Sequence, residues 1–349
     1  MRVLRFSALR GRIALEPARA GLIALAALGA GLVALFLASA LLGGEGVAAR
    51  DALAALTGRG DDAGARLVVA EFRLPRALAA MLAGGLLGCA GALVQGATRN
   101  PLADPALLGI SQGAALTVIV LAVLAPGIAE GWRPLAAFAG GISVAGLILL
   151  LSRQQDGVGP VRLLLTGIGI AAFLGAMTTA LLTYGGVNEA HAALAWIAGS
   201  VRTAGWSQVA LLALLAPVAG LLAALAVRPL SVLRLGDDLA TVLGHDAGRA
   251  RSALMALAAA LAAVSVSAAG PIAFVGLVAP HLAARLAATG PGLHLALSAA
   301  VGAGLTGLAD LAGRWLFAPV QVPAGLVTAL AGAPLMAVLM IRKLRGKSP

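Results

Sequence analysis

The sequence has few charged residues and very few aromatic ones. Asp, Glu, Lys and Arg make up 11% of its 349 residues, and Phe, Trp and Tyr make up 3%. A soluble globular domain carries about a quarter charged residues, so this composition excludes an ordinary soluble domain. The chain is 60% hydrophobic and its mean hydropathy is +0.99. These values indicate a polytopic membrane protein.

Residue types that carry out chemistry are also scarce. Cys89 is the only cysteine, so no disulfide can form within the chain, and its place in an apolar run indicates a packing role. The four histidines have no spacing typical of metal ligands. GISQG at 109–113 matches the nucleophile elbow of serine hydrolases, but no strand is expected before it. We therefore expect no catalytic residue and no metal site.

The sequence also lacks a nucleotide-binding loop. GKS at 346–348 resembles the end of a phosphate loop, but the glycine that should precede it by five residues is Ile341. GAGLTG at 302–307 matches a dinucleotide pattern without the surrounding strands, and small residues at this spacing favour a helix-packing face instead. We expect this chain to bind no cofactor, so any ATP must be bound by a partner.

Apolar runs separated by Gly, Pro and charge predict an all-α protein with about ten transmembrane helices in one domain over 1–349. The first run follows five arginines and resembles a signal peptide, but its length fits a retained span better. Gly occurs 46 times, which indicates closely packed helices. The expected spans are 20–42, 76–95, 109–125, 134–152, 162–184, 207–227, 251–269, 272–288, 293–313 and 323–341.

An even number of spans places both termini on the same side of the membrane. With the termini inside, roughly two thirds of the 25 Lys and Arg residues fall in interior segments, as the positive-inside rule requires. We therefore expect a cytoplasmic N-terminal segment over 1–19 and a cytoplasmic tail over 342–349. The net charge of +11 follows from this loop topology, and no nucleic-acid partner is expected.

The stretch from Arg73 to Ala115 has unusual residues at both ends of its expected helix. Arg73 and Arg76 flank Pro75 at the expected helix start, where cations are unfavourable, so they suggest an external anionic partner. At the other end, Asn100-Pro101-Leu102 and the following Asp-Pro pair forbid a regular helix. A rigid turn is expected there, at the opposite membrane face.

Two further places carry charged residues in a specific pattern. In LGDDLATVLGHDAGRAR at 235–251, Asp237 or Asp238 can cap a short helix that Gly244 ends, and Asp246 can cap the next helix. This segment is either a compact knob or an ordinary solvated loop. Asp310 and Arg314 lie one helical turn apart and can form an ion pair.

Three blocks resemble, in the same order, the permease subunits of bacterial importers for vitamin B12, haem and iron-siderophores, known as the FecCD type. They are RLPR with RNPLADPALLGISQGA at 73–76 and 99–114, GPIAFVGLVAPHLAAR at 270–285, and ADLAGRWLFAPVQVPAGLVTALAG at 309–332. The resemblance covers most of the chain from about Arg66 onward. It implies the type II fold of an ATP-binding-cassette (ABC) importer permease, with ATP and Mg bound by a separate ATPase.

The resemblance also implies roles for particular residues. Docking of a substrate-binding protein would use Arg73, Arg76 and Arg314, the last as an exposed residue that Asp310 can orient. The cytoplasmic gate would include Asn100, Pro101 and Leu102, together with the loop 154–161. Gln321 stands where the family usually has a glutamate. The cytoplasmic coupling loop, 229–251, would contact the ATPase through Asp237, Asp238, Leu243, Gly244, His245 and Arg249.

The implied importer lies in the bacterial cytoplasmic (inner) membrane, in contact with lipid. Its partners would be a second permease subunit, identical or related, two ATPase subunits, and a periplasmic or lipid-anchored substrate-binding protein. The segments 196–206 and 317–325 resemble siderophore permeases more than vitamin B12 permeases, so an iron(III)-siderophore is expected, with haem or vitamin B12 as the alternative. An ion-coupled secondary transporter is the alternative, but such proteins need acidic residues in mid-span, and Asp104, Asp156 and Asp310 lie at the ends of expected spans.

Overall fold

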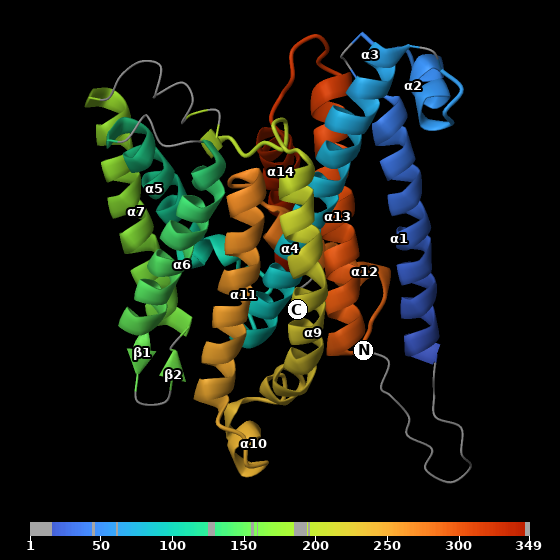
Figure 1. Ribbon diagram of the computed structural model, residues 1–349. Coiled ribbons are helices and arrows are strands. Elements are labelled where there is room, and N and C mark those ends of the chain that lie inside the picture. The colour runs from blue at the N-terminus through green and yellow to red at the C-terminus, as the bar shows by residue number, and fades with distance from the viewer. Residues whose placement is uncertain are drawn as a thin grey trace.

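The protein is described by a computed structural model covering residues 16–43, 46–60, 62–124, 130–154, 157–158, 160–184, 194 and 196–345. Within these ranges one long helix lies at each of the ten expected spans (Figure 1). The long helices are α1 (Glu16–Leu41), α4 (Leu74–Thr98), α5 (Ile110–Leu124), α6 (Arg133–Leu151), α7 (Pro160–Tyr184), α9 (Trp206–Leu233), α11 (Ala247–Ala269), α12 (Val275–Leu286), α13 (Pro291–Trp315) and α14 (Ala324–Arg345).

Short elements connect these helices. A small antiparallel hairpin joins α6 to α7 in the segment expected to help form the gate. Its two strands, β1 (Arg153–Gln154) and β2 (Gly157–Val158), have two residues each. The others are α2 (Ala49–Leu56), α3 (Ala63–Leu67), the π-helix η1 (Val68–Arg73), the 3-10 helices η2 (Pro105–Leu108) and η3 (Glu130–Trp132), and α10 (Asp237–Val242). The expected all-α membrane fold is confirmed. Parts of the expected cytoplasmic ends, 1–15 and 346–349, lie outside the described residues.

Helix α4 forms the centre of the fold and packs against α9, α11, α12 and α13. Its glycines allow this close packing. A Cβ atom on Gly88 would lie 2.2 Å from the carbonyl oxygen of Ser298, and one on Gly91 would lie 1.8 Å from that of Gly276. Lipid supplies no hydrophobic drive for helix association, so close backbone contact of this kind holds membrane helices together. Figure 1 shows α5, α6 and α7 on one side of this core and α1 on the other, alongside α13.

The start of α4 differs from the expectation that a helix begins at Pro75. The chain is helical from Ala63, because the Asp62 carboxylate accepts the backbone N–H groups of Gly64 and Ala65 and caps α3. The wide π turn of η1 then leads directly into α4. The expectation that Arg73 and Arg76 lie at a free helix N-terminus is therefore wrong. Their charge is not opposed by exposed N–H groups, so it needs another explanation.

Helix α12 is shorter than the expected span 272–288. It has 12 residues, and at about 1.5 Å per residue it covers about 18 Å of a hydrocarbon core that is about 30 Å thick. The preceding residues are irregular: Gly270 and Phe274 both have positive φ angles, 68° and 65°. Irregular backbone is tolerated at membrane depth only where protein surrounds it. Here Phe274 packs on Gly332 of α14, and Gly270 lies against the 196–200 segment.

Candidate functional site

At one end of the bundle, which the charge distribution predicts to be the outer end, Arg76 is part of a buried ion pair. Its Nε donates to both carboxylate oxygens of Asp310, at 2.8 and 3.1 Å, and its Nη1 donates to Gln321 Oε1 at 2.8 Å. Only 5% of Arg76 is exposed, and 1% of Asp310. The contacts join α4 to α13 and to the segment between α13 and α14. They place a charged, hydrogen-bonded cluster in a largely dry environment.

Arg314 shares the same carboxylate. Its Nε lies 3.4 Å from Asp310 Oδ2, one helical turn away on α13, and its Nη2 donates to both the carbonyl and the hydroxyl of Ser39 on α1. The ion pair expected from the spacing of Asp310 and Arg314 is confirmed. The expectation that Arg314 is exposed is wrong, because 0% of it is accessible. Its side chain instead fixes the end of α1 to α13.

Arg73 lies at the same end and is also fully buried. Its two terminal nitrogens donate to backbone carbonyls of Ala40 at 3.2 Å, Leu41 at 2.8 Å and Val47 at 3.2 Å. The carbonyls at a helix C-terminus have no partners within the helix, so a buried guanidinium is a suitable donor for them. The structure thus gathers the three arginines at one end, but turns each side chain inward. Their role in docking remains a prediction.

The opposite end contains the expected turn. Helix α4 ends at Thr98, and the next residue, Arg99, is its C-cap with a left-handed φ of 53°. Asn100 Oδ1 then accepts the N–H of Leu102 at 3.0 Å. Asp104 Oδ1 accepts the N–H of Ala106 at 2.8 Å and caps η2. The expected turn is present, and these local bonds stabilise it. Leu102 is 40% exposed and free to contact another surface.

The segment 235–251 forms the expected knob, with one difference in its capping. The N-cap of α10 is Gly236, with φ of 108°, so neither Asp237 nor Asp238 caps this helix. The two aspartates lie in the first turn of α10, where their negative charge stabilises the helix. Asp246 caps α11 by accepting the N–H of Arg249 at 2.8 Å, as expected. Figure 1 shows α10 projecting below the ends of the long helices.

The tip of this knob presents apolar side chains. Val242 is 83% exposed and Leu243 58%, and the neighbouring Gly244, His245 and Arg249 are exposed as well. Arg249 pairs locally with Asp246, Nε to Oδ2 at 3.1 Å. An exposed apolar tip rimmed by polar residues is typical of a surface that binds another protein. This arrangement supports the knob over the ordinary solvated loop.

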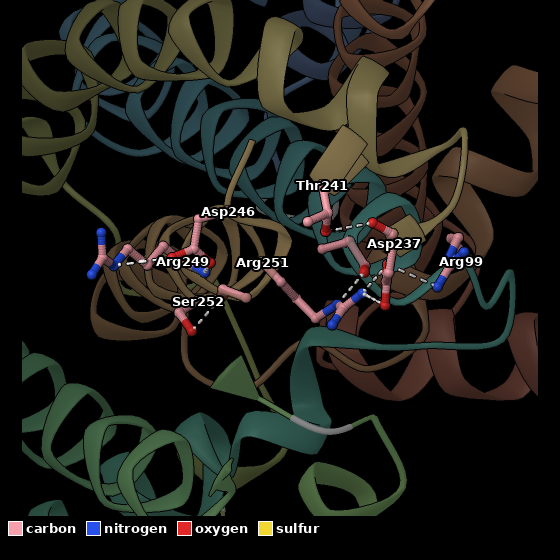
Figure 2. A network of polar contacts seen from close by, with 9 residues as sticks. Arg99, Asp237, Thr241, Asp246, Arg249, Arg251 and Ser252 are labelled. Carbon is pink, nitrogen blue, oxygen red and sulfur yellow. Dashed lines mark hydrogen bonds and ion pairs between the residues drawn. The ribbon is translucent and has the colours of Figure 1, made fainter. Parts of the chain in front are cut away.

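An ion-pair network that the sequence did not predict joins the turn to the knob (Figure 2). Asp237 accepts a hydrogen bond from Arg99 Nη2 at 3.0 Å, and Arg251 Nη2 donates to both of its oxygens at 2.8 and 2.9 Å. Arg251 is almost fully buried, and its Nε donates to the carbonyl of Ala97 on α4 at 3.1 Å. The hydrogen bond from Arg251 holds the pKa of the Asp237 carboxyl below its ordinary value. The feature of the sequence that could have indicated this network is the group of arginines, Arg234, Arg249 and Arg251, around the acidic pair Asp237 and Asp238.

The described helices have at least two cavities between them. One of about 660 Å³ lies among α4, α6, α9 and α11, and is lined by apolar side chains such as Leu86, Phe138 and Leu261. Another of about 230 Å³ lies among α12, α13 and α14, beside Phe274 and Leu305. Neither lining includes a charged residue. Among the described residues no cluster of three or more His, Cys, Asp or Glu could hold a metal ion.

The sequence matches one protein family over nearly its whole length. The family is described as the FecCD transport family, and the match covers residues 31–342. A probable siderophore transport system permease protein, YfhA of Bacillus subtilis strain 168, is 40% identical over 282 residues, which is 79% of this chain and 82% of that protein. The achromobactin transport system permease protein CbrC of Dickeya dadantii strain 3937 is 41% identical over 285 residues, 80% of each chain.

The fold is also similar to that of a solved structure. That structure is described as "An inward-facing conformation of a putative metal-chelate type ABC transporter". The TM-score is 0.78 at 25% sequence identity, and the match covers 92% of this chain and 99% of the other. The similarity therefore extends over most of the chain.

Proposed function

The chain belongs to the FecCD transport family, and from this premise we propose that it forms the translocation path of an ABC importer for an iron(III)-siderophore. It is a transporter subunit rather than an enzyme. The observation that supports the proposal most strongly is the 40% and 41% identity to siderophore and achromobactin permeases over four fifths of the chain. Haem and vitamin B12 are the alternative substrates, because permeases of the FecCD type also transport these.

The secondary-transporter alternative has little support in the geometry. Asp310 is paired with Arg76 and Arg314 near one end of α13, and Asp104 caps η2 in the turn after α4. Neither is placed in mid-span for an ion. Asp156 lies outside the described residues. Because a driving ion needs such a site, ATP hydrolysis by a separate subunit is the better source of energy.

We propose that the α10 knob binds that ATPase. Its exposed apolar tip, Val242 and Leu243, can enter a groove, while Asp237, Asp238, Gly244, His245 and Arg249 surround it. In this assignment the knob and both termini are cytoplasmic, and the protein lies in the bacterial cytoplasmic membrane. ATP and Mg are then bound by the ATPase and not by this chain.

The translocation path itself lies between two permease subunits in this proposal. An iron chelate is a polar ligand, and the cavities beside Phe138 and beside Phe274 are lined mainly by apolar side chains, so neither suits it. Asn100, Pro101 and Leu102 would close the path on the cytoplasmic side. Replacing Leu102 with alanine should then raise basal ATP hydrolysis or leak, and an unchanged value of both would count against a gate there.

At the outer end we propose that the surface around Arg73, Arg76 and Arg314 receives the binding protein. Since these side chains are buried, they act by setting the shape and charge of the surface rather than by direct contact. Arg76→Glu should weaken association of the binding protein. The assignment would be abandoned if a folded Arg76→Glu protein bound its partner as tightly as the wild type at low salt.

The substrate is tested by uptake of radioactive iron into proteoliposomes that contain the complete importer. Ferric hydroxamate, ferric catecholate, ferric citrate and haem are each offered on the binding protein, and radioactive cobalamin is offered in parallel. We expect ATP-dependent uptake of at least one iron chelate and none of cobalamin. Uptake of only cobalamin or haem would replace the siderophore assignment but keep the importer.

A further inference from the structure

We propose that Asp237 is the positioning residue that transmits movement of the ATPase to the cytoplasmic gate, by holding α10 to the end of α4 through Arg99 and Arg251. The inference rests on the proposed function, because it assigns a role within the coupling of that importer. It concerns a contact between two segments 138 residues apart in the sequence. Each step of the connection is visible in Figure 2 or in the contacts around it.

The first step joins the knob to a buried anchor. Arg251 lies on the first turns of α11, and its guanidinium is bonded at both ends: Nε to the Ala97 carbonyl and Nη2 to both oxygens of Asp237. One nitrogen is thus shared by both carboxylate oxygens, and the bond from Nε to the Ala97 carbonyl fixes the orientation of the guanidinium. Since Arg251 is almost fully buried, it cannot swing away into water when α10 is pushed.

The second step joins the knob to the turn. Arg99 is the last residue before Asn100, and its left-handed conformation turns the chain sharply at the end of α4. Its Nη2 reaches Asp237 Oδ1 at 3.0 Å. A displacement of Asp237 therefore acts on Arg99 directly and on Ala97 through Arg251. Both residues lie within three positions of the turn that contains Asn100.

The backbone on each side makes the connection stiff. Gly236 has φ of 108°, a conformation that suits glycine, and it places Asp237 at the first position of α10. Thr241 Oγ1 donates to the Asp237 carbonyl at 2.9 Å, within α10 and next to the tip residue Val242. At the other end, Asn100 Oδ1 accepts the N–H of Leu102. Hydrogen bonds within α10 and within the gate turn thus support the ion pairs of Asp237, and Arg99 is joined to the turn by the backbone.

The charges around Asp237 favour this role over a simple solvated carboxylate. Asp237 and Arg99 are each 44% exposed, whereas Arg251 is 7% exposed at its side chain. The contact is thus accessible enough to lengthen during a cycle, yet it is anchored on one side. Asp238, the neighbouring carboxylate, is exposed, and among the described residues the carboxylate that pairs with Arg99 and Arg251 is that of Asp237. Only one of the two acidic residues is placed to couple the segments.

The test uses the complete importer, reconstituted with its ATPase and binding protein. Hydrogen exchange of the backbone amides is measured at 99–104 and at 236–243, with ATP and vanadate and without nucleotide. In the wild type we expect both segments to change. In Asp237→Asn the change at 236–243 should persist, while that at 99–104 should fall about threefold, the scale expected for loss of a partly exposed ion pair. Iron uptake per ATP hydrolysed should fall as well.

Ser252→Ala is the matched control, because Ser252 is adjacent to Arg251 and bonds only to Gly248 in its own helix. It should behave as the wild type. If Asp237→Asn does not assemble, Arg99→Gln decides by the same measurement. Equal nucleotide-dependent change at 99–104 in the wild type and the variant would overturn the inference. Failure of the proposed function would look different: the wild-type complex itself would show no ATP-dependent uptake.

Discussion

At the scale of single residues, the buried cluster around Arg76 depends on one neutral partner, Gln321. Arg76 Nη1 is 2.8 Å from Gln321 Oε1, and the other face of the guanidinium is paired with Asp310. The donor is already ionised, so a carboxylate in place of the amide would turn this hydrogen bond into an ion pair, with two opposite charges in contact. Gln321 is only partly buried, so the cost of desolvating the new charge is limited.

We therefore expect Gln321→Glu to raise the thermal unfolding midpoint of the purified protein in detergent. The gain should be at most about 1 kcal/mol, the contribution of a partly exposed ion pair. Gln321→Leu is the control and should lower the midpoint, because it leaves an Arg76 donor without its acceptor. A lower midpoint for Gln321→Glu would mean that repulsion from Asp310 dominates.

Asp237 gives a prediction about pH. Its pKa is lowered in the folded protein, first by the hydrogen bond from Arg251 and also by the charges of Arg251 and Arg99. A carboxyl group with a depressed pKa contributes stability above its unfolded pKa of about 4, and this is lost only as the pH falls through the lower, folded value. The network should therefore be intact throughout the neutral range.

Coupling of iron uptake to ATP hydrolysis should thus be constant between about pH 6 and 8, where this carboxylate does not titrate. The ratio of iron transported to ATP hydrolysed, measured in proteoliposomes across that range, checks this. A ratio that fell steadily toward pH 6 would show that a group other than Asp237 controls coupling. Asp237→Asn should show a low ratio at every pH.

At the scale of helices, the function depends on how closely α4 packs. Gly91 of α4 lies so near Gly276 of α12 that a Cβ atom would be 1.8 Å from the Gly276 carbonyl oxygen. That atom belongs to the backbone and cannot rotate away. The helices must separate if Gly91 acquires a side chain, and overpacking of this kind costs about 1–3 kcal/mol.

Gly91→Ala should accordingly lower the unfolding midpoint and reduce uptake. Gly175→Ala is the control: it lies in α7, where a Cβ would meet nothing within 4 Å. Alanine is also the better helix former, so this variant should be neutral or slightly more stable. Equal midpoints for Gly91→Ala and the wild type would show that α12 can shift without loss.

The positions of the helices could largely be predicted from sequence patterns. All ten long helices could be predicted, because apolar runs bounded by Gly, Pro and charge mark them directly. The extension of α4 to Ala63 was missed, since a π turn carries the helix through a charged segment. The shortness of α12 was missed because 270–274 is apolar but irregular.

The burial of the three arginines could not be predicted from local sequence. Arg76 is separated from Asp310 by 234 positions and Arg314 from Ser39 by 275. Only the packing of α1, α4 and α13 brings these partners together. The sequence indicated that the arginines share one end of the molecule, but local charge patterns treat each cation as solvent-exposed. The same limit hid the contact between Asp237 and Arg99.

At the scale of the whole molecule, α4 connects two charged clusters at opposite ends. Arg76 near its start is tied to α13, and Ala97 and Arg99 at its end are tied to α11 and α10. Helices α1 and α7 bury little of their surface within the chain. Such apolar faces suit lipid or a second permease subunit, so the single chain fits a larger assembly in the membrane.

The energy source of transport can be measured directly. Proteoliposomes holding the permease with its ATPase and binding protein are loaded with ATP, and accumulation of a radioactive ferric chelate is followed. We expect accumulation that requires hydrolysable ATP and persists when ionophores collapse the proton and sodium gradients. Accumulation without ATP that those ionophores abolish would contradict this expectation and would make the protein an ion-coupled transporter.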